Sequence, residues 1–263
     1  METIQREIYL NQLINKKNNG LIKIISGIRR SGKSYLLFNI YKNYLLNNGV
    51  KEENIISLAL DDDRNRDYRN PDKLSEYLYS KINNQQEMFY IFLDEVQFVI
   101  SKEELKKEEP IRLYGILNGL SHLNNVDIYI TGSNSKFLSS DILTEFRGRG
   151  DEIRVFPLTF SEFYSSNIFK DKYEAWNEYS MYGGLPLLLS KKTDREKVTY
   201  LKEVIAKTYI QDVVERNNLK GDLVLETLID ILASSVGSLT SPKKLANTFS
   251  SNQMKVTDIT LSN

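Results

Sequence analysis

Apolar residues follow two alternating patterns through roughly the first 160 positions of the chain. In one pattern they form short, nearly unbroken runs, which are typical of strands buried on both faces of a parallel sheet. In the other they recur every three or four positions, as on the buried face of an amphipathic helix. The strand-like runs are 22–25, 54–60, 88–95, 126–134 and 151–158. The helical patterns are 3–15, the residues from Lys33 onward, 72–82, 111–123 and 141–146.

This alternation predicts an α/β fold with a five-stranded parallel sheet sandwiched by helices, because parallel neighbours need crossover connections. Strand-like runs stop near residue 160, and residues 161 to about 218 have a helical pattern rich in aromatic side chains. We expect a sheet domain at 1–160, a helical lid at 161–220 and a further segment at 221–263. The stretch Tyr182-Gly-Gly-Leu-Pro186 interrupts the lid, either as a plain helix break or as rigid backbone held against a ligand.

Composition narrows the classes of function. The 263 residues carry 35 basic and 35 acidic side chains, so no global field indicates a nucleic-acid binder, although a local basic patch stays open. The absence of cysteine excludes disulfides and thiolate chemistry, and the single histidine, His122, is expected to be a surface or capping residue. No apolar stretch is long enough to span a membrane, and the N-terminus lacks a signal-peptide core, so we expect a cytoplasmic protein without a membrane partner.

The first candidate site follows the first strand. Gly27 and Gly32 bracket four residues and are followed by Lys33 and Ser34, which matches the P-loop spacing. Glycines let successive N–H groups turn around a phosphate, and the helix that begins near Lys33 adds its positive end. Lys33 is expected to reach the β- and γ-phosphates of ATP, and Ser34 to bind Mg²⁺. The alternative is a strand-to-helix turn that contains these letters by chance. The predicted nucleotide-binding residues here are Gly27, Ile28, Arg29, Arg30, Ser31, Gly32, Lys33, Ser34 and Tyr35.

Two carboxylates end the third strand-like run, in the form of a Walker B element. In parallel sheets this edge is where ligands bind. Asp94 is expected to hold the Mg²⁺ shell together with Ser34, and Glu95 to polarise the attacking water. The alternative is a strand that simply leaves the core through acidic residues.

Three further segments carry weaker signals. The run 126–134 ends in small polar residues, so Asn134, or its neighbour Ser133, is expected near the γ-phosphate unless the segment is an ordinary turn. Arg147 and Arg149 precede the last strand and are candidates for a γ-phosphate arginine finger, with an RNA or protein contact, or a plain turn, as alternatives. The charged run 61–69 is read as a solvated loop, with a nucleotide-proximal loop as the alternative.

Taken in order, the motifs resemble those of AAA+/STAND-like P-loop ATPases, in particular the prokaryotic AAA-domain, DUF4143-containing ATP-binding proteins. The resemblance implies that Pro186 presses on the adenine and that Arg6 flanks the base. It also implies a winged helix after the lid. Residues 223–233 and 241–249 look like its first two helices. Since the rest of that unit does not follow, the chain is expected to be a truncated product or a fragment. The motifs are Gly27-Ile-Arg-Arg-Ser-Gly-Lys-Ser34, Phe92-Leu-Asp-Glu-Val-Gln97, Ile130-Thr-Gly-Ser-Asn-Ser135, Arg147-Gly-Arg149, Phe156-Pro-Leu-Thr-Phe-Ser-Glu-Phe163 and Tyr182-Gly-Gly-Leu-Pro186.

The sequence therefore predicts a Mg²⁺-dependent ATPase that acts as a nucleotide-driven switch, with ATP and Mg²⁺ as cofactors. The alternative is a DNA- or protein-binding adaptor whose nucleotide is structural. A homo-oligomer and a DNA or protein partner both stay open. The predicted catalytic residues are Glu95, Asp94, Lys33, Asn134, Arg147 and Arg149.

Overall fold

The computed structural model describes residues 4–101, 103–104, 110–132, 150–206 and 222–251. By its internal contacts the chain divides into two compact units, Met1–Val198 and Thr199–Asn263. The finer division at residues 160 and 220 that the sequence suggested stays a prediction.

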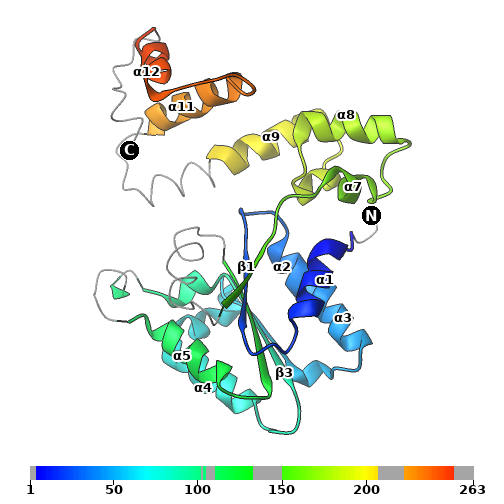
Figure 1. The fold of residues 1–263 in the computed structure, drawn as a ribbon, viewed down its shortest axis with the longest axis vertical. Helices are drawn as coiled ribbons and strands as arrows, with labels where there is room; N and C mark the ends of the chain where they lie inside the picture. Colours follow the sequence, from blue (N-terminus) through cyan, green and yellow to red (C-terminus); the bar gives the residue numbers. More distant parts are fainter. Residues whose placement is uncertain (1–3, 102, 105–109, 133–149, 207–221, 252–263) are drawn as a thin grey trace. The chain divides into compact units, whose positions relative to one another are not determined.

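The first unit is built on a five-stranded sheet whose paired strands all run parallel, in the order β2-β3-β4-β1-β5 (Figure 1). Side chains along β1, β3 and β4 are buried on both faces, which is why these strands appear in the sequence as unbroken apolar runs. The predicted parallel sheet is confirmed. Its order places β4 between β1 and β3. The strands are β1 (Ile22–Ser26), β2 (Ile55–Ala59), β3 (Phe89–Asp94), β4 (Val126–Thr131) and β5 (Gly150–Arg154).

Helices cover both faces of this sheet (Figure 1). One face packs against α1 and a continuous helical segment made of α2, the π-helical η1 and α3, through residues such as Leu13, Ile25 and Tyr41. The other face packs against α4 and α5 through residues such as Ile24 and Leu117. Ile24 and Ile25 therefore point to opposite cores, as successive strand residues must. These helices are α1 (Glu7–Lys16), α2 (Lys33–Tyr35), η1 (Leu36–Tyr41), α3 (Lys42–Asn47), α4 (Pro71–Lys81) and α5 (Arg112–Ser121).

The last strand is shorter than the predicted 151–158. The Val155 N–H still donates to Ser26 O at 2.8 Å, but the Leu158 N–H donates to Gly184 O at 2.7 Å. The chain therefore leaves the sheet after Val155, and by Leu158 its backbone bonds to the turn before Pro186 instead of to a strand. The run 61–69 also differs from a plain loop, since 3₁₀ turns form there. The short 3₁₀ segments are η2 (Glu52–Asn54), η3 (Asp63–Arg69), η4 (Val96–Val99) and η7 (Pro186–Ser190).

Helices follow the sheet, as the sequence indicated. They are α7 (Phe160–Tyr164), α8 (Lys172–Tyr182) and α9 (Asp194–Val204). Phe160 packs edge-on against Trp176, with ring centroids 5.0 Å apart, and Phe163 contacts Tyr179 at 5.4 Å. Not every aromatic residue of this segment packs in this way, since Tyr173 is 82% exposed.

In the second unit, α11 (Asp222–Ser234) and α12 (Pro242–Ser251) pack through Ile231, Leu245 and Phe249. These helices agree with the helical patterns at 223–233 and 241–249. Across the part of the chain that the structure describes, no helix has the length and apolar character needed to cross a membrane.

Candidate functional site

The glycine loop lies between β1 and α2, at the carboxyl edge of the sheet. Gly27 has φ 136° and Gly32 has φ 96°, values that disfavour any residue with a Cβ. A Cβ on Gly27 would also lie 2.1 Å from Val155 O, so backbone proximity alone would exclude a side chain there. Both glycines of the motif are thus required by the local fold, and Arg30 between them is also left-handed, with φ 65°.

Lys33, at the start of α2, is 4% exposed. Its Nζ donates to Gly27 O at 2.9 Å and to Ile28 O at 3.0 Å, so the ammonium group lies inside the curve of the loop. Burial lowers the pKa of Lys33, and the nearby charges of Glu95 and Asp94 partly oppose that shift. The loop lysine and the two carboxylates of β3 are therefore close enough to interact electrostatically, as the sequence predicted.

Asp94, the last residue of β3, is 4% exposed. Its carboxylate accepts hydrogen bonds from the hydroxyl groups of Thr131 and Ser34. Burial raises the pKa of Asp94, these two hydrogen bonds lower it, and the charges of Glu95 and Asp61 raise it. The structure thus brings together the two predicted metal ligands, Ser34 and Asp94, and places the beginning of the 61–69 run within electrostatic reach of them.

This donor set fits Mg²⁺. The metal prefers hard oxygen ligands and usually binds one or two protein groups, with phosphate and water oxygens completing its octahedron. Among the described residues there is no group of three or more His, Cys, Asp or Glu side chains that could form an all-protein metal site. A hydroxyl and a carboxylate beside a phosphate loop match a metal shared with a nucleotide.

Glu95 follows β3 in a left-handed conformation, with φ 54° and ψ 50°. For a residue with a side chain this conformation is uncommon, and it concentrates at functional sites. The Glu95 N–H donates to Thr131 Oγ1 at 3.2 Å, and the Glu95 carboxylate accepts from the Gln97 side-chain amide. These contacts fix the direction in which the carboxylate leaves the strand.

Arg6 and Pro186 both lie at the end of the glycine loop. A Cβ on Gly32 would meet Arg6 Nη1 and Pro186 Cγ, each at 3.6 Å. Gly184, two residues before Pro186, has no room for a Cβ, which would lie 2.1 Å from Leu158 O. Gly183 ends α8, whereas Gly184 is required by the close approach of its backbone to Leu158, so the pair does more than break a helix.

Comparison with known families gives a direct result. A family model described as "AAA domain" matches residues 19–164, which is more than half of the chain. The chain belongs to the AAA domain family. This membership agrees with the parallel sheet and its glycine loop, and the predicted P-loop AAA+ fold is confirmed.

The C-terminal part matches a different family. Residues 173–260 match DUF8612, a domain of unknown function, so the expected likeness to DUF4143-containing proteins is not shown. An uncharacterized protein of Haemophilus influenzae is 34% identical over 98% of this chain and 62% of its own length. An uncharacterized protein of Methanocaldococcus jannaschii is 30% identical over 94% of this chain and 53% of its own length. The chain therefore spans less than two thirds of the length of these relatives.

Solved structures give remote likenesses. AMPPCP-bound DnaA from Aquifex aeolicus is 18% identical, with a TM-score of 0.44 over 94% of this chain and 76% of that chain. The Aeropyrum pernix ORC1 protein in complex with DNA is 14% identical, with a TM-score of 0.43 over 98% of this chain and 81% of that chain.

The structure describes most of the predicted site residues and brings several of them together. Gly27, Lys33, Ser34, Asp94 and Glu95 converge on one edge of the sheet. The side chains of Ile28 and Tyr35 are exposed, at 48% and 46%, whereas that of Ser31 is buried. The predicted Asn134, Arg147 and Arg149 lie outside the described residues.

Sequence reasoning missed Thr131 and Gln97. Thr131 ends β4 just after Ile130, which pairs with Leu93 of β3, and this register places it beside Asp94. The signal for Thr131 in the sequence is a polar residue at the end of an apolar run, whereas the prediction rested on the residues after it. Gln97 lies in 3₁₀ segment η4, whose turn folds it back onto Glu95, and no helical or strand periodicity indicates such a contact.

A pocket of about 750 Å³ lies near this site but is distinct from the phosphate loop. It opens between residues 4–8 and α7, and its lining includes Arg6, Glu162 and Ser165 but none of the loop residues 27–34. The pocket and the glycine loop are therefore two separate features of the surface.

Proposed function

We propose that the chain binds Mg-ATP at the loop between β1 and α2 and hydrolyses it. The observation that carries this proposal is the contact of Asp94 with both Ser34 and Thr131, because it joins the end of β3 to the phosphate loop across β4. A phosphate-binding loop without this junction would support binding alone.

The loop would receive the triphosphate through its backbone N–H groups and through Lys33. The Lys33 ammonium group now donates to Gly27 O and Ile28 O, and phosphate oxygens are stronger acceptors because they are charged. Its exchange of carbonyl partners for phosphate oxygens would need no unfolding of the helix. The buried ammonium group, whose charge Glu95 and Asp94 stabilise, would offset part of the phosphate charge.

Ser34 and Asp94 would hold Mg²⁺, which when bound neutralises charge on the β- and γ-phosphate oxygens. Glu95 would orient and polarise the attacking water, with the Gln97 amide holding the carboxylate in position. Water addition to the γ-phosphorus would break its bond to the bridging oxygen of ADP and release inorganic phosphate. A switch function, in which hydrolysis loosens the helices after residue 160, is part of the proposal.

The test separates binding from turnover. Lys33→Ala should abolish detectable Mg-ATP binding by calorimetry, whereas Glu95→Gln should retain binding and lose phosphate release. Lys73→Ala on α4 is the matched control, because Lys73 is exposed and pairs only weakly with Asp67 at 3.6 Å. Equal ATP affinity in wild type and Lys33→Ala would refute the proposal. Nucleotide retained through purification without phosphate release, with or without DNA, would favour the adaptor alternative.

A further inference from the structure

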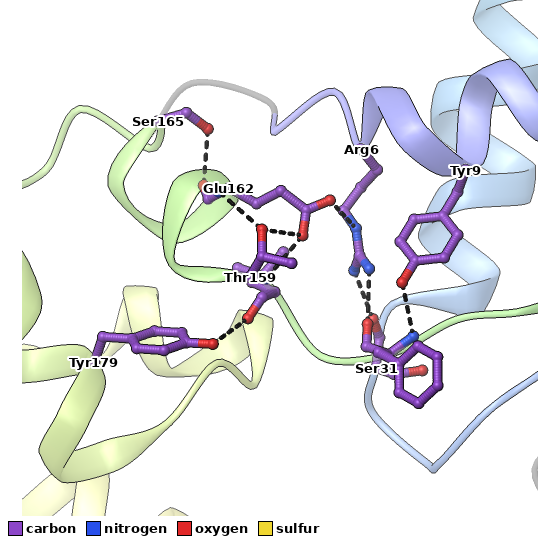
Figure 2. Close-up of polar contacts among 9 residues, drawn as sticks. Arg6, Tyr9, Ser31, Thr159, Glu162, Ser165 and Tyr179 are labelled. Atoms are coloured by element: carbon purple, nitrogen blue, oxygen red, sulfur yellow. Dashed lines mark hydrogen bonds and ion pairs between the residues drawn. The ribbon is translucent and has the colours of Figure 1, made fainter.

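Each of the three guanidinium nitrogens of Arg6 has a protein partner. Nη1 donates to Ser31 O at 3.0 Å, Nη2 donates to Phe156 O at 2.7 Å, and Nε lies 3.0 Å from Glu162 Oε1 (Figure 2). The side chain is 5% exposed, and its backbone is left-handed, with φ 49°. The guanidinium plane also lies over the ring of Tyr9, at 4.6 Å from the centroid. One residue before α1 therefore connects the phosphate loop, the exit of β5 and α7.

Glu162 is itself held in place. It is the third residue of α7, and its Oε2 accepts from Thr159 N at 2.8 Å and from Thr159 Oγ1 at 3.1 Å. The Thr159 side chain accepts in return from the Glu162 N–H, which completes a capping box (Figure 2). With one carboxylate oxygen used by the cap, the other is left for Arg6. The ion pair is thus anchored to the first turn of a helix and is 5% and 12% exposed at its two ends.

The contact with Ser31 O has a consequence for the loop. The Ser31 carbonyl and the Gly32 N–H belong to one peptide unit, and none of the described peptide bonds is cis. In a trans peptide the C=O and N–H point in opposite directions. When Arg6 binds the carbonyl, it turns the Gly32 N–H away from itself. That amide is part of the motif whose N–H groups cradle phosphates.

We infer that Arg6 and Glu162 are positioning residues that set the Ser31–Gly32 peptide for triphosphate binding, and that Arg6 does not act as a hydrogen-bonding contact to the base. This inference rests on the proposed nucleotide-binding function. The contacts with Ser31 O, Phe156 O and Glu162 Oε1 hold the guanidinium group against the protein, and only 5% of Arg6 is exposed, so little of the group is open to a base. Pro186, on the same side of Gly32, remains available to contact the base.

The experiment compares two ligands that differ in the base. Calorimetry measures the Kd of Mg-ATP and of Mg-tripolyphosphate, which has no base or sugar, for wild type, Arg6→Gln, Glu162→Gln and the double variant. Glu162→Gln removes the charge but keeps an acceptor for the capping box. Pro186→Ala is the matched control for a residue on the base side, and circular dichroism checks that each variant is folded.

For Arg6→Gln we expect the Kd of both ligands to rise by a similar factor, roughly tenfold for the loss of one charged hydrogen bond. Glu162→Gln should raise both Kd values by about threefold to tenfold, since the contact with Arg6 loses its negative charge. The Kd of each ligand for the double variant should lie within about twofold of its value for Arg6→Gln, because the two residues act as one unit. Pro186→Ala should weaken ATP alone.

Several outcomes would overturn the inference. One is an Arg6→Gln variant that loses affinity for ATP but keeps the wild-type Kd for tripolyphosphate, since Arg6 would then contact the base. Another is a folded Glu162→Gln variant with wild-type affinity for both ligands, which decides the question even if Arg6→Gln does not fold. A wild type that binds ATP but not tripolyphosphate would also contradict it. A wild type that binds neither would refute the proposed function instead.

Discussion

Thr131→Val tests the junction between β3, β4 and the phosphate loop. Valine has nearly the shape of threonine but lacks the hydroxyl, and Thr131 is fully buried. The hydroxyl donates to the Asp94 carboxylate and accepts from the Glu95 N–H, so the substitution removes both contacts. Thr131→Ser is the matched control, because serine keeps the hydroxyl and loses only a methyl group.

The expected loss can be worked from these two bonds. A hydrogen bond to a charged group contributes about 1.5–3 kcal/mol, and a neutral one about 1 kcal/mol. We expect Thr131→Val to lower the free energy of unfolding by about 2–4 kcal/mol at neutral pH. For a unit of this size each kcal/mol corresponds to roughly 2–4 °C in Tm. Thr131→Ser should lose about 1 kcal/mol, for one buried methyl group.

The loss should depend on pH in a known direction. Burial raises the pKa of Asp94, so its ionisation costs stability as pH rises from its ordinary value of 3.8 through its value in the folded protein. The Thr131 hydrogen bond opposes that shift because it stabilises the carboxylate. Without this hydrogen bond, ionising Asp94 in the folded protein costs more free energy. The difference between wild type and Thr131→Val should therefore be smallest below the ordinary pKa and should grow as pH rises.

Trp176 gives a convenient probe, since it is the single tryptophan of the chain and lies in the first unit. Urea unfolding followed by its fluorescence, at pH 7 and at the lowest pH where the fold persists, measures the difference. The same variant should need more Mg²⁺ for half-maximal ATP turnover, because the Asp94 carboxylate loses the hydroxyl group that holds it in position. A loss that is equal at both pH values, or equally large for Thr131→Ser, would refute this reasoning.

Three more predictions follow from buried contacts. Gly27→Ala should prevent nucleotide binding, because its Cβ would lie 2.1 Å from Val155 O. In the control Gly49→Ala the new Cβ would have no atom within 4 Å, so the variant should lose only about 1–2 kcal/mol of stability from its left-handed backbone. Mg-ATP calorimetry and Tm distinguish the two variants, and nucleotide binding by Gly27→Ala would contradict the loop geometry. Gln97→Ala should lower kcat by about tenfold and leave KM nearly unchanged, since Gln97 positions Glu95 and is not proposed to contact the nucleotide. A tenfold rise in KM would indicate a binding role instead. Lys23→Met leaves the buried Asp127 without its cation and should lower the free energy of unfolding by about 3–5 kcal/mol. Urea unfolding measures the loss, and an unchanged unfolding midpoint would contradict the prediction.

Much of the architecture could be predicted from the sequence because it depends on local periodicity. Unbroken apolar runs indicate strands buried on both faces, and the five strands appear where those runs are. The glycine loop could be predicted too, since its chemistry lies in eight consecutive residues. Strand and helix ends were less well predicted. The last strand stops at Arg154, and four residues later the Leu158 N–H bonds to Gly184 O, a partner that nothing near Arg154 in the sequence indicates.

The sequence by itself determined which residues form the phosphate loop and which carboxylates end the third strand. Only the tertiary structure decided what holds them. Thr131 lies between the strands, Gln97 contacts Glu95, and Arg6, paired with Glu162 156 residues away, binds Ser31 O of the loop. The physical reason is that periodicity and motif spacing describe neighbours along the chain. Hydrogen bonds between strand ends depend on strand order and register, which are set by the packing of the whole sheet.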